Sequence, residues 1–156
     1  MASATLESIA WTGDALRVLD QRRVPDETVV LELRTIEGVV EAIATLAVRG
    51  ANVLGTAGAF GFVLGVRGGL TPDDAAARLV AARPTAVNLR VAVELAHAAL
   101  VRGEDPLDVA LGLLEEDRAA CLAIGEHGRR ELSSASRLLT HCNTGCLLYT
   151  SPSPRD

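Results

Sequence analysis

The run GANVLGTAGAFGFVLGV, residues 50–66, decides the fold, because it lies between Arg49 and Arg67 without one charged side chain. It holds five glycines and two phenylalanines. Its 17 residues fall short of the ~20 apolar residues that a helix needs to cross a bilayer. We therefore expect a helix from Asn52 to Val66 that is buried in the core of a soluble protein.

The segment before this run has the periodicity of an amphipathic helix. Apolar residues recur there at spacings of three and four: Ile36, Val39, Val40, Ile43 and Ala47. Thr35 is the candidate N-cap of this helix, and Arg49-Gly50 is its expected end.

Three more helices are expected after the central run. Thr71 offers a capping hydroxyl before Pro72 and two aspartates, a combination typical of a helix start. Pro84 separates this helix from another over residues 86–101. Asp105-Pro106 opens a longer helix that is predicted to reach about Ile124.

Strand character is found at both ends of the chain. The β-prone runs 8–11, 15–20 and 29–33 are separated by turn residues and predict a small antiparallel meander. The segment RLLTHC, residues 137–142, returns to strand character and ends in a polar turn at 143–145. We read this order as a small β unit, a set of helices and the first strand of a new unit.

Composition narrows the classes of function. The chain has 156 residues and a formal charge of −5, and all 15 basic residues are arginine. A modestly acidic protein with 3% aromatic residues is a poor partner for nucleic acid or for an anionic membrane. Three cysteines and an N-terminus without a secretory pattern favour a cytoplasmic protein with reduced thiols.

The last eleven residues, 146–156, read CLLYTSPSPRD and contain the only tyrosine and two of the six prolines. One interpretation is a flexible Ser/Pro tail. We favour another, because the string matches the translation of a transposase library adapter codon for codon. On this interpretation residues 146–156 are a non-native tail and are excluded from fold reasoning.

Two arginines stand where a phosphate could bind. Arg49, Gly50 and Ala51 precede the apolar helix, and a guanidinium beside free helix N–H groups suits an anion. Arg83 precedes the helix over 86–101, with Thr85 available as a cap. In both places the alternative, favoured on local sequence alone, is a turn between helices with a solvated arginine.

The three cysteines have different expected roles. Cys142 ends an apolar strand beside His141, where a thiol could act as acid or base, although a small buried cysteine is an equal alternative. A zinc site at His141, Cys142 and Cys146 is not expected, because it lacks a fourth ligand and Cys146 belongs to the tail. Cys121 lies among alanines and leucine, so we expect it in the core.

Taken together, four motifs resemble the methylthioribose-1-phosphate isomerase family in order and approximate spacing. They are LDQRRVP (19–25), AIATLAVRGANVLGTAGAFG (42–61), ARPTAVNL (82–89) and LLTHCNTG (138–145). The resemblance covers essentially all of residues 8–145. One departure is visible, since Asn52 stands where the family usually has proline.

The resemblance implies an α/β protein in two parts. An N-terminal domain, residues 1–134, would combine a small antiparallel β unit with a helical bundle. Residues 135–145 would supply only the first strand of a Rossmann-like C-terminal domain, so that the chain is a fragment, inactive alone. The full-length enzyme would be a homodimer, with its active site between the two domains.

The resemblance also implies the site residues. Arg49, Gly50, Ala51 and Arg83 match substrate-binding positions, and Cys142 matches the catalytic cysteine, whose acid–base partner is an aspartate of the C-terminal domain. The sugar phosphate substrate carries its phosphate on the anomeric oxygen, so its ring cannot open as an ordinary sugar does. Hydrogen must move from C2 to C1, as a proton through an enediolate-like species or as a hydride. No metal and no organic cofactor is implied.

Two relatives of this family give alternative functions. A ribose 1,5-bisphosphate isomerase should carry extra basic residues for its second phosphate, and no clear candidate is present. The regulatory subunits of translation initiation factor 2B are non-catalytic interaction proteins. Cys142 within HCNTG favours an enzyme, and the aspartate of the C-terminal domain would decide between the two classes.

Overall fold

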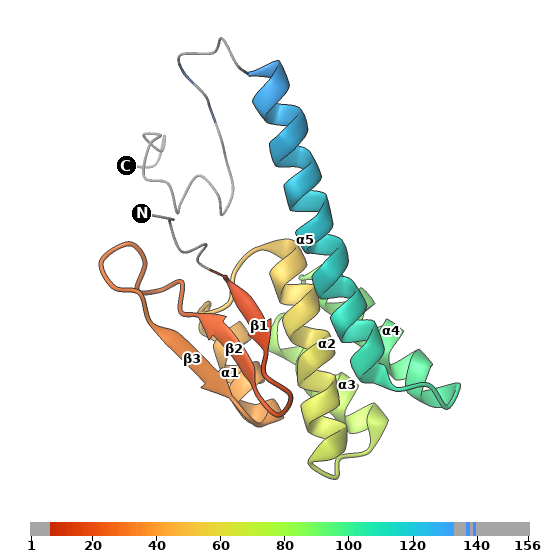
Figure 1. The fold of residues 1–156 in the computed structure, drawn as a ribbon. Coiled ribbons are helices and arrows are strands. Elements are labelled where there is room, and N and C mark those ends of the chain that lie inside the picture. The colour runs from red at the N-terminus through yellow and green to blue at the C-terminus, as the bar shows by residue number, and fades with distance from the viewer. Residues whose placement is uncertain (1–6, 133–136, 138, 140–156) are drawn as a thin grey trace.

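The computed structural model describes residues 7–132 together with 137 and 139, and it begins with a small sheet. The strands β1 (Ile9–Trp11), β2 (Leu16–Leu19) and β3 (Val30–Leu33) lie in that order. Both pairs are antiparallel, with Arg17 of β2 opposite Ala10 on one side and opposite Glu32 on the other. The predicted meander is thereby confirmed, and Figure 1 shows it beside the helices.

Five helices follow among the described residues: α1 (Ile36–Ala44), α2 (Ala51–Arg67), α3 (Pro72–Ala82), α4 (Val87–Val101) and α5 (Pro106–Glu131). Successive helices from α2 onward reverse direction, so α2 and α4 begin at the end of the bundle where α3 finishes (Figure 1). The predicted caps of α1 and α3 are confirmed, and α5 begins at the predicted Asp105-Pro106, where Asp105 also proves to be a side-chain cap. Thr35 accepts from Gly38, Thr71 from Asp74, and Asp105 from Leu107.

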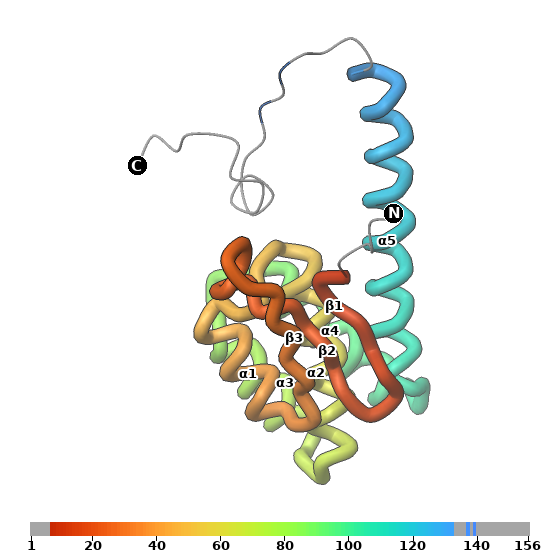
Figure 2. The backbone as a smooth tube through the Cα atoms, turned by 60° about the vertical axis from the view of Figure 1, so that its left-hand side comes forward, coloured from red at the N-terminus to blue at the C-terminus, as the bar shows by residue number. Residues whose placement is uncertain are grey.

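Helix α2 is the centre of the core, as its uncharged sequence predicted. Every residue from Leu54 to Gly65 is buried, and α2 contacts each of the other four helices. The ring of Phe60 stacks on Trp11 of β1 with 4.9 Å between centroids, which joins the sheet to this helix. Figure 2 shows the strands crossing in front of α2.

The end of α1 differs from the prediction. The helix finishes at Ala44 and does not continue to Arg49. Leu46 has a φ of 63°, which the right-handed helix does not permit, and the Thr45 hydroxyl bonds the Glu41 carbonyl at 2.8 Å. Ala47 remains fully buried by way of this turn, so its apolar character imitated one more turn of helix.

Three expectations for α4 and α5 are also wrong. Ala86, rather than Thr85, is the N-cap residue of α4, and no side chain caps that helix. Helix α5 continues past Ile124 to Glu131, and Cys121 on it is exposed. Figure 1 shows why: the second half of α5 projects beyond the bundle, so its apolar residues meet no core.

The predicted strand over 137–142, the turn at 143–145 and the proposed tail at 146–156 lie largely or wholly outside the described residues. Among the described residues, none of the helices is long and apolar enough to cross a membrane.

Candidate functional site

A cavity of about 510 Å³ opens at the end of the bundle where α2 and α4 begin and α3 ends. It brings together the two motifs that were singled out separately in the sequence. Its walls are formed by Arg49, Gly50, Ala51, Leu54, Arg83, Thr85, Ala86, Val87 and Asn88. Residues far apart in the chain meet there because α3 carries the chain back to the end at which α2 began.

The two helix starts at this cavity lack the features that complete a helix N-terminus. Gly50 is the N-cap of α2 and Ala86 that of α4, and neither helix has a side-chain cap or an acidic residue in its first turn. The other three helices have both. Uncapped first-turn N–H groups and the positive ends of two helix dipoles therefore face one region, an arrangement that favours an anion.

The charges around the cavity have one sign. Arg49 and Arg83 are both half-buried, and none of the described residues that line the cavity is acidic. Within the described part of the chain, the Arg83 guanidinium makes no ion pair. Gly50 has a φ of 96°, a left-handed value that glycine adopts without strain, so the chain can turn sharply into α2 after Arg49.

The backbone of Arg49 is held from the loop after β2. Gln21 is buried, with 5% of its surface exposed. Its backbone N–H donates to the Ala47 carbonyl at 3.0 Å, and its Nε2 donates to the Arg49 carbonyl at 3.2 Å. These two bonds fix the turn that leads from α1 into the cavity.

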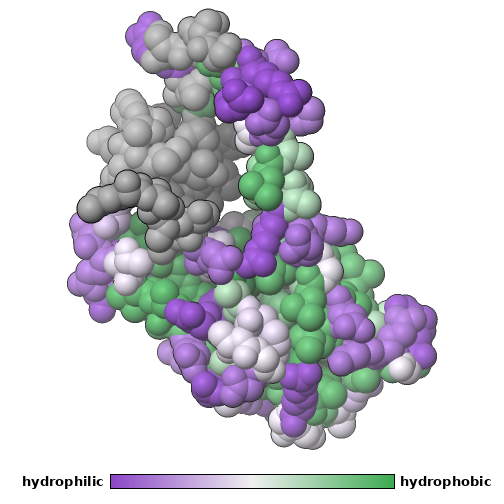
Figure 3. Space-filling view, in the orientation of Figure 1, coloured by the Kyte–Doolittle hydropathy of each residue, from purple (hydrophilic) through white to green (hydrophobic). Residues whose placement is uncertain are grey.

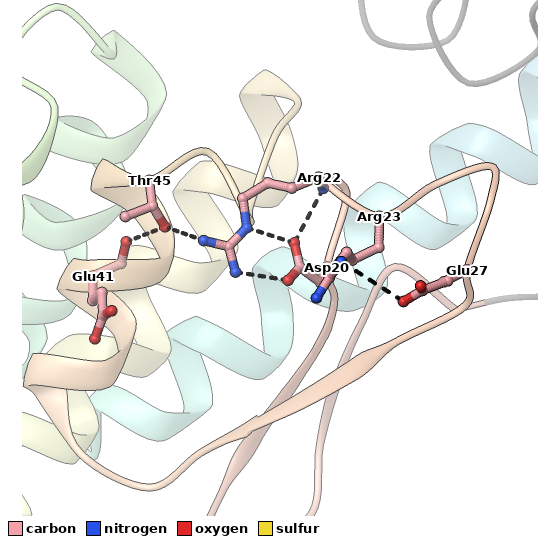
Figure 4. A network of polar contacts seen from close by, with 6 residues as sticks. All are labelled: Asp20, Arg22, Arg23, Glu27, Glu41 and Thr45. Atoms are coloured by element: carbon pink, nitrogen blue, oxygen red, sulfur yellow. Dashed lines mark hydrogen bonds and ion pairs between the residues drawn. The ribbon is translucent and has the colours of Figure 1, made fainter.

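A second contact holds the start of the same turn, and Figure 4 shows it. The buried carboxylate of Asp20 accepts from Arg22 Nε at 2.8 Å and from Nη2 at 2.7 Å. Arg22 Nη1 donates to the Thr45 hydroxyl at 3.0 Å, directly after α1. Arg22 thus holds the pKa of Asp20 below its usual range, because its hydrogen bonds favour the ionised carboxylate more than burial opposes it.

Sequence reasoning assigned no role to Asp20, Gln21 or Arg22, although they lie in one of the four quoted motifs. The position of these residues directly after a buried strand could have indicated a structural role. Polar residues that directly follow a buried strand must either reach water or find partners, and here they find partners in the turn before Arg49. Asn88, which belongs to the motif ARPTAVNL and was assigned no role from the sequence, also lines the cavity.

The remaining candidate residues belong to the part of the chain that the structure does not describe. Cys142, His141 and Cys146 lie outside the described residues. Among the residues that the structure describes, no three His, Cys, Asp or Glu side chains gather closely enough to hold a metal ion. The chemistry that the described cavity supports is therefore the binding of an anion, with phosphate as the best match to two guanidinium groups and two helix starts.

The chain is similar in sequence to proteins of a known family. Residues 47–151 match the model of the initiation factor 2 subunit family. The methylthioribose-1-phosphate isomerase of Parasynechococcus marenigrum is 43% identical over 146 residues, which are 90% of this chain and 43% of that protein. The chain thus spans about two fifths of the length of this curated relative.

Two solved structures share the fold. The 5-methylthioribose 1-phosphate isomerase of Pyrococcus horikoshii OT3 superposes with a TM-score of 0.70 at 29% identity, over 82% of this chain and 41% of that one. Subunit delta of the translation initiation factor eIF-2B from A. fulgidus gives 0.63 at 38% identity, over 72% and 38%.

Proposed function

The chain belongs to the initiation factor 2 subunit family, and from this membership we propose that it is part of an aldose–ketose isomerase. The substrate would be S-methyl-5-thioribose 1-phosphate and the product S-methyl-5-thioribulose 1-phosphate, a step of methionine salvage. This proposal draws its reaction from the relatives named above. Its support in this chain is the cavity at the starts of α2 and α4. No acidic residue is among the described residues that line this cavity, neither helix start has a side-chain cap, and an arginine precedes each of them.

The cavity would hold the phosphate on the anomeric oxygen of the sugar. Arg49 and Arg83 each offer several donors in a planar fork, which matches the geometry of phosphate oxygens. Backbone N–H groups at the start of α2 would complete the shell. Anchoring the phosphate in this way would fix C1 and C2 relative to the groups that move hydrogen between them, which is the main contribution of a binding site to rate.

The proton transfers would fall to Cys142 and to an aspartate supplied by a C-terminal domain. In an apolar cleft the pKa values of a thiol and a carboxyl can be moved toward the working pH, so that one group accepts a proton while the other donates. We propose no metal and no organic cofactor for this reaction.

The proposed organisation of the whole protein follows from the family. Residues 1–134 would form the N-terminal domain, and 135–145 would begin a Rossmann-like domain. The full-length protein would be a cytoplasmic homodimer, and this chain alone would be inactive because it carries half of the active-site cleft.

A second candidate function is a non-catalytic interaction subunit. The fold shared with subunit delta of eIF-2B from A. fulgidus favours it. The two candidates make opposite predictions for catalysis, so one assay separates them.

That assay measures conversion of S-methyl-5-thioribose 1-phosphate to its ketose by the full-length protein that carries this chain. We expect turnover by the parent protein and its loss in Cys142→Ser. Arg83→Gln should raise KM by about 10- to 100-fold, which corresponds to the usual free energy of one charge-assisted hydrogen bond. Absence of turnover in the parent would favour the interaction subunit.

Arg78→Gln is the matched control for the arginine variant. Arg78 lies on α3, the helix that ends just before Arg83, and it pairs with Glu37 at 3.2 Å but does not line the cavity. Its loss removes the same charge and should leave KM unchanged. An equal rise of KM in both variants would show a general effect of charge rather than a phosphate contact at Arg83.

A further inference from the structure

We infer that Asn52 is a positioning residue that holds the two anion-binding helix starts at a fixed separation. The inference rests on the proposed phosphate site and concerns how that site is built. Asn52 occupies the first turn of α2, three residues after Arg49, and Asn88 occupies the first turn of α4, five residues after Arg83. Any contact between these two amides therefore links the two arginine-bearing segments.

Such a contact is present, and it extends to a third helix. Asn88 Nδ2 donates to Asn52 Oδ1 at 3.1 Å, and Asn52 Nδ2 donates to Asp117 Oδ1 at 2.7 Å. Asp117 lies on α5, which packs against both α2 and α4. The amide of Asn52 thus joins α2, α4 and α5, and through Asn88 this link reaches the wall of the cavity.

The direction of these bonds is fixed by Asp117. An ionised carboxylate can only accept hydrogen bonds, so Asn52 must turn its NH₂ group toward Asp117. This leaves the Asn52 oxygen for the NH₂ group of Asn88. Alanine at position 52 would have no side-chain amide and could form neither bond.

The backbones of α2 and α4 approach closely next to this bond. A Cβ atom placed on Gly55, one turn further along α2, would lie 3.0 Å from the backbone oxygen of Asn88. Glycine at this position therefore permits the close approach of α4, and the Asn52–Asn88 bond resists movement of the two helix starts apart.

Removal of Asp117 tests the inference, because electrostatics and positioning predict opposite changes in the affinity for a phosphate compound. Asp117 is absent from the cavity that holds Arg49 and Arg83, and it carries a negative charge. If charge alone mattered, its removal would tighten the binding of a phosphate compound. If it anchors Asn52, its removal should weaken binding, because the two arginines lose their fixed spacing.

The experiment titrates S-methyl-5-thioribose 1-phosphate into the full-length protein that carries this chain, in a Cys142→Ser background that stops turnover, and measures Kd by calorimetry. We expect Asp117→Ala and Asn52→Ala each to raise Kd about fivefold, the value of one hydrogen bond. The double variant should bind no more weakly than either single one, because both remove the same link. Asp117→Asn keeps an acceptor for Asn52 and should bind within about twofold of the parent.

Asp73→Ala is the control, since Asp73 also bonds another helix, through His97 at 2.9 Å, but lies at the opposite end of the bundle. It should leave Kd unchanged, and circular dichroism checks that every variant is folded. Unchanged or tighter binding by Asp117→Ala would overturn the inference while leaving the phosphate site in place. If the parent itself fails to bind, or if Arg83→Gln binds as well as the parent, the phosphate site is wrong and the inference falls with it.

Discussion

At the scale of single residues, Asp20 couples the charge state of the protein to its fold. Asp20 is 3% exposed, and its carboxylate accepts two hydrogen bonds from the Arg22 guanidinium, which lower its pKa. Because the folded pKa lies below the unfolded value of about 3.9, the ionised carboxylate stabilises the fold above that pH. This stabilisation is lost as the pH falls through the folded pKa.

The change that tests this is Asp20→Asn, measured as the free energy of unfolding in urea at pH 7 and at pH 3. We expect the variant to be less stable at pH 7 by about 1–2 kcal/mol and to lose the part of the acid sensitivity that Asp20 contributes. Arg22→Gln keeps the carboxylate but removes its donor, so it should also lower stability at pH 7. A variant as acid-sensitive as the parent would show that other groups control acid unfolding.

At the scale of secondary structure elements, the glycines of α2 set how closely its neighbours pack. A Cβ atom on Gly61 would lie 2.8 Å from Leu79 Cδ2 and 2.9 Å from Val39 Cγ1, and both partners are fully buried. In an exposed helix, alanine is better than glycine by roughly 1 kcal/mol. At Gly61 the overlap with two fixed side chains should outweigh that preference, since overpacking a core costs about 1–3 kcal/mol.

We therefore expect Gly61→Ala to lower the free energy of unfolding by about 1–2 kcal/mol, measured by urea denaturation. Gly112→Ala on α5 is the matched control, because nothing lies within 4 Å of a Cβ atom there. That variant should gain about 0.5–1 kcal/mol from helix propensity. If both variants change stability in the same direction, close packing around α2 is not what glycine provides at Gly61.

At the scale of the whole molecule, the sequence predicted what depends on local chemistry. The caps at Thr35 and Thr71, the start of α5 at Asp105-Pro106 and the burial of α2 follow from side chains within a few residues of each other. The pairing of Arg49 with Arg83 in one cavity was expected only through a resemblance. No local pattern contains it, because it depends on α3 returning the chain to the end where α2 begins.

The wrong predictions, for the end of α1 and for Cys121, concern features that depend on contacts between distant parts of the chain, which no local pattern reveals. Leu46 takes a left-handed turn after α1, and the apolar residues around Cys121 have no core to enter. Helical periodicity reports that one face of a helix is apolar, but whether a partner covers that face is a property of the assembled molecule. Leu122 and Ile124, 76% and 71% exposed, are the clearest cases, and Figure 3 shows hydrophobic side chains between hydrophilic ones along this part of α5.

Stability should therefore be unevenly distributed along α5. Ala110 is fully buried, whereas residues 118–127 are all exposed. An isolated helical segment of this length is marginal in water, so the projecting half should open without unfolding the body. Ala110→Gly should lower the free energy of unfolding by about 1–2 kcal/mol, from lost helix propensity and lost burial.

Ala123→Gly makes the same chemical change in the projecting half of the same helix. It should reduce helix content in circular dichroism and leave the urea midpoint of the body unchanged, because the segment is already open before the body unfolds. Equal losses of unfolding free energy in the two variants would show that α5 unfolds as one cooperative unit with the bundle. Unequal losses would place the limit of the cooperative body near Arg118, where the Glu7 carboxylate still pairs with α5 at 2.6 Å.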